Sequence, residues 1–184
     1  MLLEEKELSS KTIFDGKVVH LCMDEVRLPN GKTATREYVK HVGAVCVVAL
    51  TDDDQVILER QFRYPFHREL IEIPAGKLDS KSEDPMLAAL RELREETGYI
   101  PDTIRHIGDF YGSPAILDEN IRMFLATGLS REGQELDDDE FLEVFTAPIE
   151  TVVEQILSGE IADGKTQVAV LKTYELLKKE GKIK

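Results

Sequence analysis

Alternating apolar and polar positions run through the first third of the chain and predict β-strands. Residues 17–28 and 33–41 show this alternation on the two sides of a Pro-Asn-Gly turn at 29–31. A continuous apolar run over 43–50 is typical of a strand that is buried on both faces. Further strands are expected over 55–63, 70–73, 104–112 and 121–127.

One helix is well defined by the residues at its two ends. Asp84 can accept hydrogen bonds from the first free amides, Pro85 suits the first helical position, and Gly98 suits the position after the last turn. Between these ends, apolar residues recur at helical spacing and predict a buried stripe. The stripe consists of Met86, Ala89, Leu90, Leu93 and Thr97.

Two more helices are expected near the end of the chain, over 148–157 and 165–179. Strands interleaved with a few helices predict an α/β sandwich. We expect an N-terminal arm of antiparallel strands over 1–42, followed by one main domain over 43–184.

Composition and charge narrow the class of protein. The chain has 184 residues, of which 42% are hydrophobic and 32% charged, as in a globular protein. Its 23 Lys and Arg against 36 Asp and Glu give a net charge of −13, which argues against nucleic-acid binding. No apolar stretch reaches the ~18–20 residues of a membrane span, and the start lacks a secretory pattern. Cys22 and Cys46 lie in apolar runs typical of buried thiols, so we expect a cytoplasmic protein.

Three carboxylates lie on one face of the well-defined helix. At 100° per residue, Glu92, Glu95 and Glu96 fall within about 100° of one another, away from the apolar stripe. Such a cluster repels itself unless a cation lies in it, and Mg²⁺ prefers carboxylate oxygens as ligands. Taken alone, the three glutamates are better explained by a solvated acidic helix face, which is common.

A wider pattern favours the metal. Residues 91–98 read R-E-L-R-E-E-T-G, and Glu83 precedes them with seven residues between. This pattern resembles the Nudix box of the Nudix hydrolases. The matching positions are Glu83, Arg91, Glu92, Glu95, Glu96 and Gly98. Six such matches arise by chance in roughly one of 10⁷ to 10⁸ windows. The chain has six residues between Gly76 and Glu83 where the family has five, an insertion in a loop that tolerates length changes.

The resemblance implies a fold, a cofactor and a reaction. The fold is a mixed-sheet α/β/α sandwich, and the reaction is Mg²⁺-dependent hydrolysis of a diphosphate, with Mn²⁺ as another possible ion. Glu92 and Glu96 would be the main metal ligands, and Glu95 a further one with a catalytic role. The backbone carbonyl of Ala75 would complete the set, and Arg91 would orient the glutamates.

Three further stretches resemble the ADP-ribose pyrophosphatase subfamily. Pro114 lies fifteen residues after Tyr99, a Gln-Phe-Arg sequence at 61–63 precedes Ile-Glu-Ile-Pro-Ala-Gly at 71–76, and residues 29–45 resemble the N-terminal arm of that subfamily. The resemblance implies that ADP-ribose is split into AMP and ribose 5-phosphate. It also implies a homodimer. The implied substrate contacts are Arg36, Glu37, His41, Arg63, Lys77 and Ser113.

The general base and the substrate both leave alternatives open. Within the acidic loop over 131–140, Glu140 best matches the family's base, and a solvated loop explains it about as well. Other candidate substrates are another nucleoside diphosphate sugar or a dinucleotide polyphosphate. A Nudix module that binds ADP-ribose without catalysis and an acidic cation-buffering scaffold are the alternatives outside enzymology. The intact glutamates argue against the first of these, and the box itself argues against the second.

Overall fold

A computed structural model describes residues 3–136 and 141–183. Its described residues form three α-helices: α1 (Pro85–Thr97), α2 (Ile149–Ser158) and α3 (Gly164–Lys179). A short 3-10 helix covers Tyr64–Phe66. The strands are β1 (Lys6–Asp15), β2 (His20–Arg27), β3 (Thr33–Lys40), β4 (Ala44–Ala49), β5 (Gln55–Arg63), β6 (Arg68–Glu72), β7 (Ala75–Lys77), β8 (Tyr99–Phe110), β9 (Ile121–Arg131) and β10 (Leu142–Pro148).

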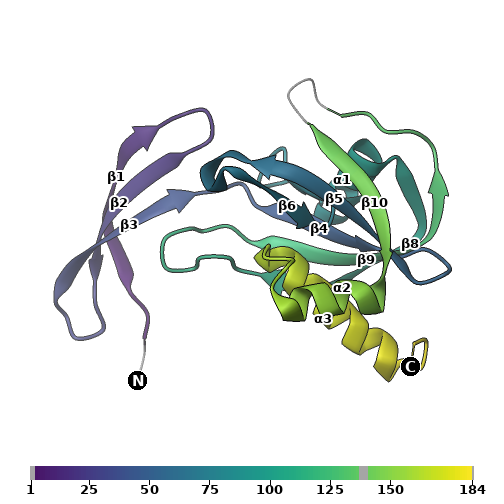
Figure 1. The fold of residues 1–184 in the computed structure, drawn as a ribbon. Coiled ribbons are helices and arrows are strands. Elements are labelled where there is room, and N and C mark those ends of the chain that lie inside the picture. Colours follow the sequence, from purple (N-terminus) through teal and green to yellow (C-terminus); the bar gives the residue numbers. More distant parts are fainter. Residues whose placement is uncertain (1–2, 137–140, 184) are drawn as a thin grey trace.

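In the described part of the chain, two sheets and three helices form the body of the molecule. One sheet has the order β7-β4-β9-β8 and is mixed, because β4 runs parallel to β9 and antiparallel to β7. The second sheet, β10-β5-β6, is antiparallel. In Figure 1, α2 and α3 lie together on one side of the sheets and α1 lies on the other. The predicted α/β/α sandwich with a mixed sheet is confirmed.

The central strand β4 is buried on both faces, as its continuous apolar run predicts. Cys46 and Val48 belong to the core that α2 and α3 cover, whereas Val45 and Val47 belong to the core that α1 covers. Because side chains alternate along a strand, one short strand joins both hydrophobic cores. Cys22 and Cys46 are both buried and free, as predicted.

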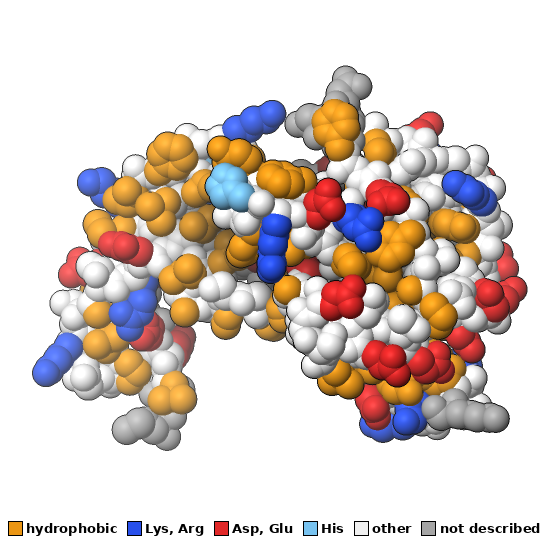
Figure 2. Space-filling view, viewed as in Figure 1, with side chains coloured by type: hydrophobic (Ala, Val, Ile, Leu, Met, Phe, Trp, Pro, Cys, Tyr) orange, Lys and Arg blue, Asp and Glu red, His pale blue; other side chains and the backbone are white. Residues whose placement is uncertain are grey.

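The N-terminal arm is a separate antiparallel sheet of β1, β2 and β3. It stands away from the body in Figure 1, and Figure 2 shows a notch between the two. Val39 ties it to the body, since its amide donates to the Ile116 carbonyl (2.8 Å) and its carbonyl accepts from the Asp118 amide (3.2 Å). No strand was predicted for β1, because every residue of this strand is exposed and no burial pattern marks it.

The well-defined helix is α1, with the predicted ends. The Asp84 carboxylate accepts from the Met86 amide (2.8 Å), and Gly98 has a φ of +73° after the last turn. The prediction that Met86 belongs to the buried stripe is wrong, since the residue is 41% exposed. The face of α1 that packs on the sheet begins one turn later, at Ala88 and Ala89.

Two strand predictions are several residues too short at one end. The strand expected from residue 104 begins at Tyr99, and that expected to end at 127 continues to Arg131. Pro101 argues against a strand at this position, so the sequence pattern does not predict the start of β8. Because β8 is the outer strand of its sheet, proline is tolerated there. The three-residue β7 was not predicted as a strand. Among the described residues, no helix is long and apolar enough to cross a membrane.

Candidate active site

A cavity of about 890 Å³ opens beside the mixed sheet, and two groups of charged side chains line it. One group is the set of glutamates on α1. The other lies at the ends of β5 and β6 and at the start of α3, and includes Arg63, Glu72 and Lys165. The cavity therefore has an acidic wall and a wall of mixed charge.

The short strand β7 positions two of the α1 glutamates. Glu96 is only 4% exposed, and its Oε2 accepts a hydrogen bond from the backbone amide of Ala75 (2.8 Å). The Glu92 carboxylate lies directly against Gly76, where an added Cβ would be 1.9 Å from the Glu92 Cδ. Only glycine allows this close approach, so the Ala75–Gly76 backbone forms a cradle for both carboxylates.

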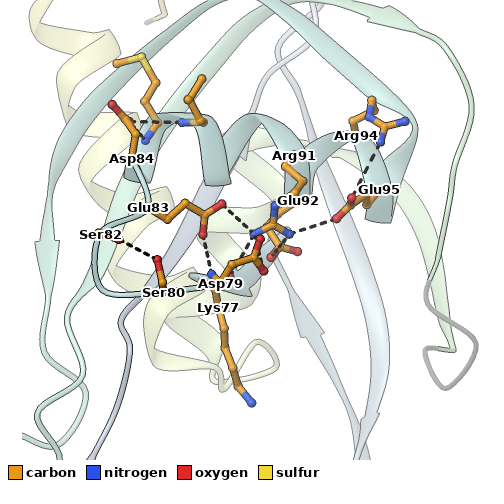
Figure 3. A network of polar contacts seen from close by, with 12 residues as sticks. Lys77, Asp79, Ser80, Ser82, Glu83, Asp84, Arg91, Glu92, Arg94 and Glu95 are labelled. Carbon is orange, nitrogen blue, oxygen red and sulfur yellow. Dashed lines mark hydrogen bonds and ion pairs between the residues drawn. The ribbon is translucent and has the colours of Figure 1, made fainter.

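Arg91 connects the remaining carboxylates (Figure 3). Its Nη1 donates to Glu92 (2.9 Å) and to Glu95 (3.2 Å), and its Nη2 donates to Glu83 (3.4 Å) and to the backbone carbonyl of Lys77 (3.3 Å). Burial lowers the pKa of the Arg91 guanidinium, but the charge and hydrogen bond of Glu92, together with Glu95 and Asp79, outweigh burial and raise this pKa. The guanidinium therefore stays charged and holds the glutamates by charge-assisted hydrogen bonds.

Glu83 takes part in this network despite the longer loop before it. Its second oxygen accepts from the backbone amide of Asp79 (2.6 Å), which closes the loop onto the start of α1. The extra residue between Gly76 and Glu83 is therefore absorbed in the loop, and the carboxylate still reaches Arg91.

The residues of the acidic wall fit a hard divalent cation by their chemistry. Ala75, Glu92, Glu95 and Glu96 all line the same cavity, and carboxylate and carbonyl oxygens are the ligands that such ions prefer. Within residues 3–136 and 141–183, no group of three or more His, Cys, Asp or Glu is arranged to enclose an ion. Arg91, placed between Glu92 and Glu95, is the cation that balances their charge here.

The wall of mixed charge is built around Glu72. Arg63 donates to both of its oxygens, from Nε (2.6 Å) and from Nη2 (2.8 Å), and the Nζ of Lys165 binds the same carboxylate. Burial would raise the pKa of Glu72, but Arg63 and Lys165 outweigh it and lower this pKa to about 2. The sequence pattern points to Arg63 but not to Glu72 and Lys165, although Glu72 lies within the 71–76 stretch.

Other predicted contacts lie outside this cavity. On the arm, Arg36 forms a bidentate pair with Glu5 (2.6 and 2.9 Å), and Glu37 is exposed on β3. The His41 ring accepts from the Gly43 amide (3.0 Å) and lies 3.4 Å from Glu119, one of the residues that line the cavity. Arg36 and Glu37 are therefore not among the residues that line the cavity of their own chain.

The last three predicted residues differ in their positions. Lys77 lines the cavity, although its side chain points away from Arg91 in Figure 3. Ser113 follows Gly112, a lining residue, and its carbonyl accepts from the amides of Ile116 and Leu117 in a turn. Glu140 lies outside the described residues.

Comparison with known protein families defines the class. Residues 40–166 match the family model described as the NUDIX domain, and residues 5–39 match that of the nucleoside diphosphate sugar hydrolase N-terminal domain. The fold and the glutamate-lined cavity are therefore those of a hydrolase, and the chain belongs to the Nudix family. Nudix hydrolases generally use divalent metal ions.

Three individual proteins are similar to this chain over most of its length. An ADP-ribose pyrophosphatase of Bacillus subtilis is 48% identical over 170 residues, 91% of both chains, which confirms the resemblance to that subfamily. A methanol dehydrogenase activator of Bacillus methanolicus is 42% identical over 181 residues, 96% of this chain and 97% of the relative. A crystal structure of an ADP compounds hydrolase shares the fold, with a TM-score of 0.85 at 20% identity over 100% and 99% of the two chains.

The cradle yields a test at Gly76. We expect Gly76→Ala to lower kcat about 100-fold, because the new Cβ displaces the Glu92 carboxylate and misplaced catalytic groups cost about that much. Circular dichroism should show an intact fold, since the φ of Gly76 is not positive. Gly112→Ala is the matched control on the same cavity, because its Cβ would meet only Phe110, at 3.6 Å. Equal activity of the two variants would contradict the cradle.

Proposed function

We propose that this protein hydrolyses the diphosphate bond of ADP-ribose in a Mg²⁺-dependent reaction. Water adds to one phosphorus and the bridging oxygen leaves with the other phosphate, so the products are AMP and ribose 5-phosphate. The observation that carries the proposal is the cavity itself, which is lined both by the α1 glutamates and by Arg63 and has room for a diphosphate. The relative from Bacillus subtilis supports the choice of ADP-ribose.

The residues of this chain divide the work between the two walls. Glu92 and Glu96, with Glu95 and the Ala75 carbonyl, hold the divalent ion. When bound, the ion neutralises the diphosphate and lowers the pKa of a water ligand toward neutrality. Arg91 keeps the glutamates in place.

Positive charge on the wall of mixed charge binds the substrate. Arg63 approaches a phosphate from there, which a chain of net charge −13 needs in order to hold an anion. From the resemblance we also assign substrate contacts to Lys77 and Ser113, which lie at or next to the cavity, and to His41 behind Glu119. The buried free thiols Cys22 and Cys46 agree with a cytoplasmic location.

The proposal is tested by substrate and by one ligand substitution. With Mg²⁺, we expect release of AMP from ADP-ribose, loss of activity in EDTA, and a decrease of kcat by at least 100-fold in Glu96→Gln. The glutamine can still accept the bond from the Ala75 amide, so its melting temperature should stay close to that of the wild type. Chromatography of the products measures turnover. Turnover of Glu96→Gln within threefold of the wild type would contradict the assignment.

The same assay separates the alternatives. GDP-mannose, other nucleoside diphosphate sugars and dinucleotide polyphosphates are run beside ADP-ribose, with Mn²⁺ in parallel with Mg²⁺. A higher kcat/KM for one of them would replace ADP-ribose as the substrate. Binding of ADP-ribose without release of AMP would favour a sensing module. The panel is needed to identify the substrate, because the relatives differ in the activity that their names give: one is an ADP-ribose pyrophosphatase and another a methanol dehydrogenase activator.

We assign the general base to Glu140 on the resemblance alone. Loss of a general base lowers kcat by roughly 10²–10⁴ and leaves ground-state binding unchanged. We therefore expect that decrease in Glu140→Gln with KM nearly constant, measured by steady-state kinetics. Glu143→Gln is the control, because the Glu143 carboxylate is bound to Arg60 (2.8 Å). A decrease of kcat in Glu143→Gln and none in Glu140→Gln would contradict this assignment and identify Glu143 as the base.

We propose that the protein is a homodimer assembled through the arm. Arg36 and Glu37 lie outside the cavity of their own chain, so contact with substrate requires the site of a second subunit. The arm also exposes large apolar side chains, visible in Figure 2 as patches on its surface. The exposed large apolar residues of the arm include Leu8, Ile13, Phe14, Val18 and Val19.

Sedimentation equilibrium tests the assembly. We expect a mass near twice 20.8 kDa at micromolar concentration, and a shift toward the monomer in Phe14→Asp, because the apolar contact is then charged. In the dimer, Arg36→Ala should raise KM more than kcat falls. A fully active monomer near 21 kDa would contradict this assembly.

A further inference from the structure

Lys165 is a buried cation at the start of α3 that none of the roles above uses. Its side chain is only 11% exposed, and its Nζ contacts two carboxylates, those of Glu72 and Asp163 (3.1 Å to the latter). Asp163 is also the N-cap of α3, since its Oδ2 accepts from the Thr166 amide (2.9 Å). A lysine is rarely this buried unless it is paired, and here it has two partners.

The pairing of Lys165 leads directly to Arg63. Arg63 uses its Nε and Nη2 on Glu72, the carboxylate that Lys165 also binds. Within the described part of the chain, its Nη1 makes no hydrogen bond, and the guanidinium lines the cavity at 40% side-chain exposure. This free nitrogen is the part of Arg63 that can meet a phosphate.

The charges of the group balance only when Lys165 is included. Arg63 and Lys165 contribute two positive charges, and Glu72 and Asp163 contribute two negative ones. Without Lys165, both carboxylates would share Arg63, since the charge of Asp163 already acts on its pKa. The wall facing the diphosphate would then carry a net negative charge, and the guanidinium would be drawn away from the cavity.

We propose that Lys165 is a positioning residue for substrate binding. By holding Glu72 and neutralising Asp163, it keeps the outer edge of Arg63 free for the diphosphate. The inference rests on the proposed hydrolysis of a nucleoside diphosphate sugar, and assigns to the Lys165–Asp163 pair a part in that site.

Steady-state kinetics with ADP-ribose and Mg²⁺ test the inference. We expect Lys165→Met to raise KM at least tenfold while kcat stays within threefold, since Arg63 acts on binding. Lys179→Met is the matched control: it makes the same change on an exposed lysine of α3, fourteen residues or about 21 Å along the helix. Its KM should equal that of the wild type. An unchanged KM in folded Lys165→Met would overturn the inference.

A charge-restoring variant separates positioning from direct contact. Asp163→Asn removes the excess carboxylate, and asparagine caps a helix as well as aspartate. The double variant Lys165→Met/Asp163→Asn should therefore recover a KM within threefold of the wild type. A lysine that touched the phosphate itself would not be replaced in this way, so a folded double variant with a raised KM overturns the inference.

Two provisions keep the test of Lys165 independent of misfolding and of the proposed substrate. If Lys165→Met does not fold, because it leaves Glu72 and Asp163 buried without their cation, the double variant alone decides by the same KM criterion. Turnover by the wild type is scored first, on ADP-ribose and on the panel of nucleoside diphosphate sugars. A wild type that hydrolyses another member of the panel refutes the proposed substrate, and Lys165 is then tested on that member.

Discussion

The hydrogen bond from the Ala75 amide to the Glu96 carboxylate joins the core of the molecule to its chemistry. Ala75 lies opposite Cys46 on β4, the strand that is buried on both faces, so its backbone position is fixed by the two hydrophobic cores. The next residue, Gly76, lies against Glu92. Because α1 packs on that sheet through Ala88, Ala89 and Leu93, helix and cradle share one rigid support. Carboxylates held in place in this way need no rearrangement when substrate arrives.

An acidic chain can offer cations to a diphosphate only where carboxylates hold them. Arg91 and Arg63 both follow this rule, the first among the glutamates of α1 and the second on Glu72. Each pairing raises the pKa of its arginine, so both remain charged. The net charge of −13 therefore does not describe the cavity, where the local arrangement of paired charges decides what binds.

Local signals predicted the parts of the site that lie close together in the sequence. The ends of α1, the face shared by its glutamates and the buried strand β4 all follow from spacing over a few residues. The contact of Glu72 with Lys165 joins residues 93 apart and depends on how α3 packs, which no local pattern encodes. The strand β1 could not be predicted because it buries no side chain and so has no pattern of apolar residues. It forms only by pairing with β2.

The arm and the cavity are linked by one loop. Val39, at the end of β3, bonds to Ile116 and Asp118, and this loop continues into Glu119, which lines the cavity. Gly112, at the start of the same loop, also lines it. The position of the arm is therefore set by the segment that forms one side of the cavity. In the dimer that we propose, a second subunit that binds the arm would contact a sheet anchored beside the site, and Arg36 and Glu37 would reach substrate only through that contact.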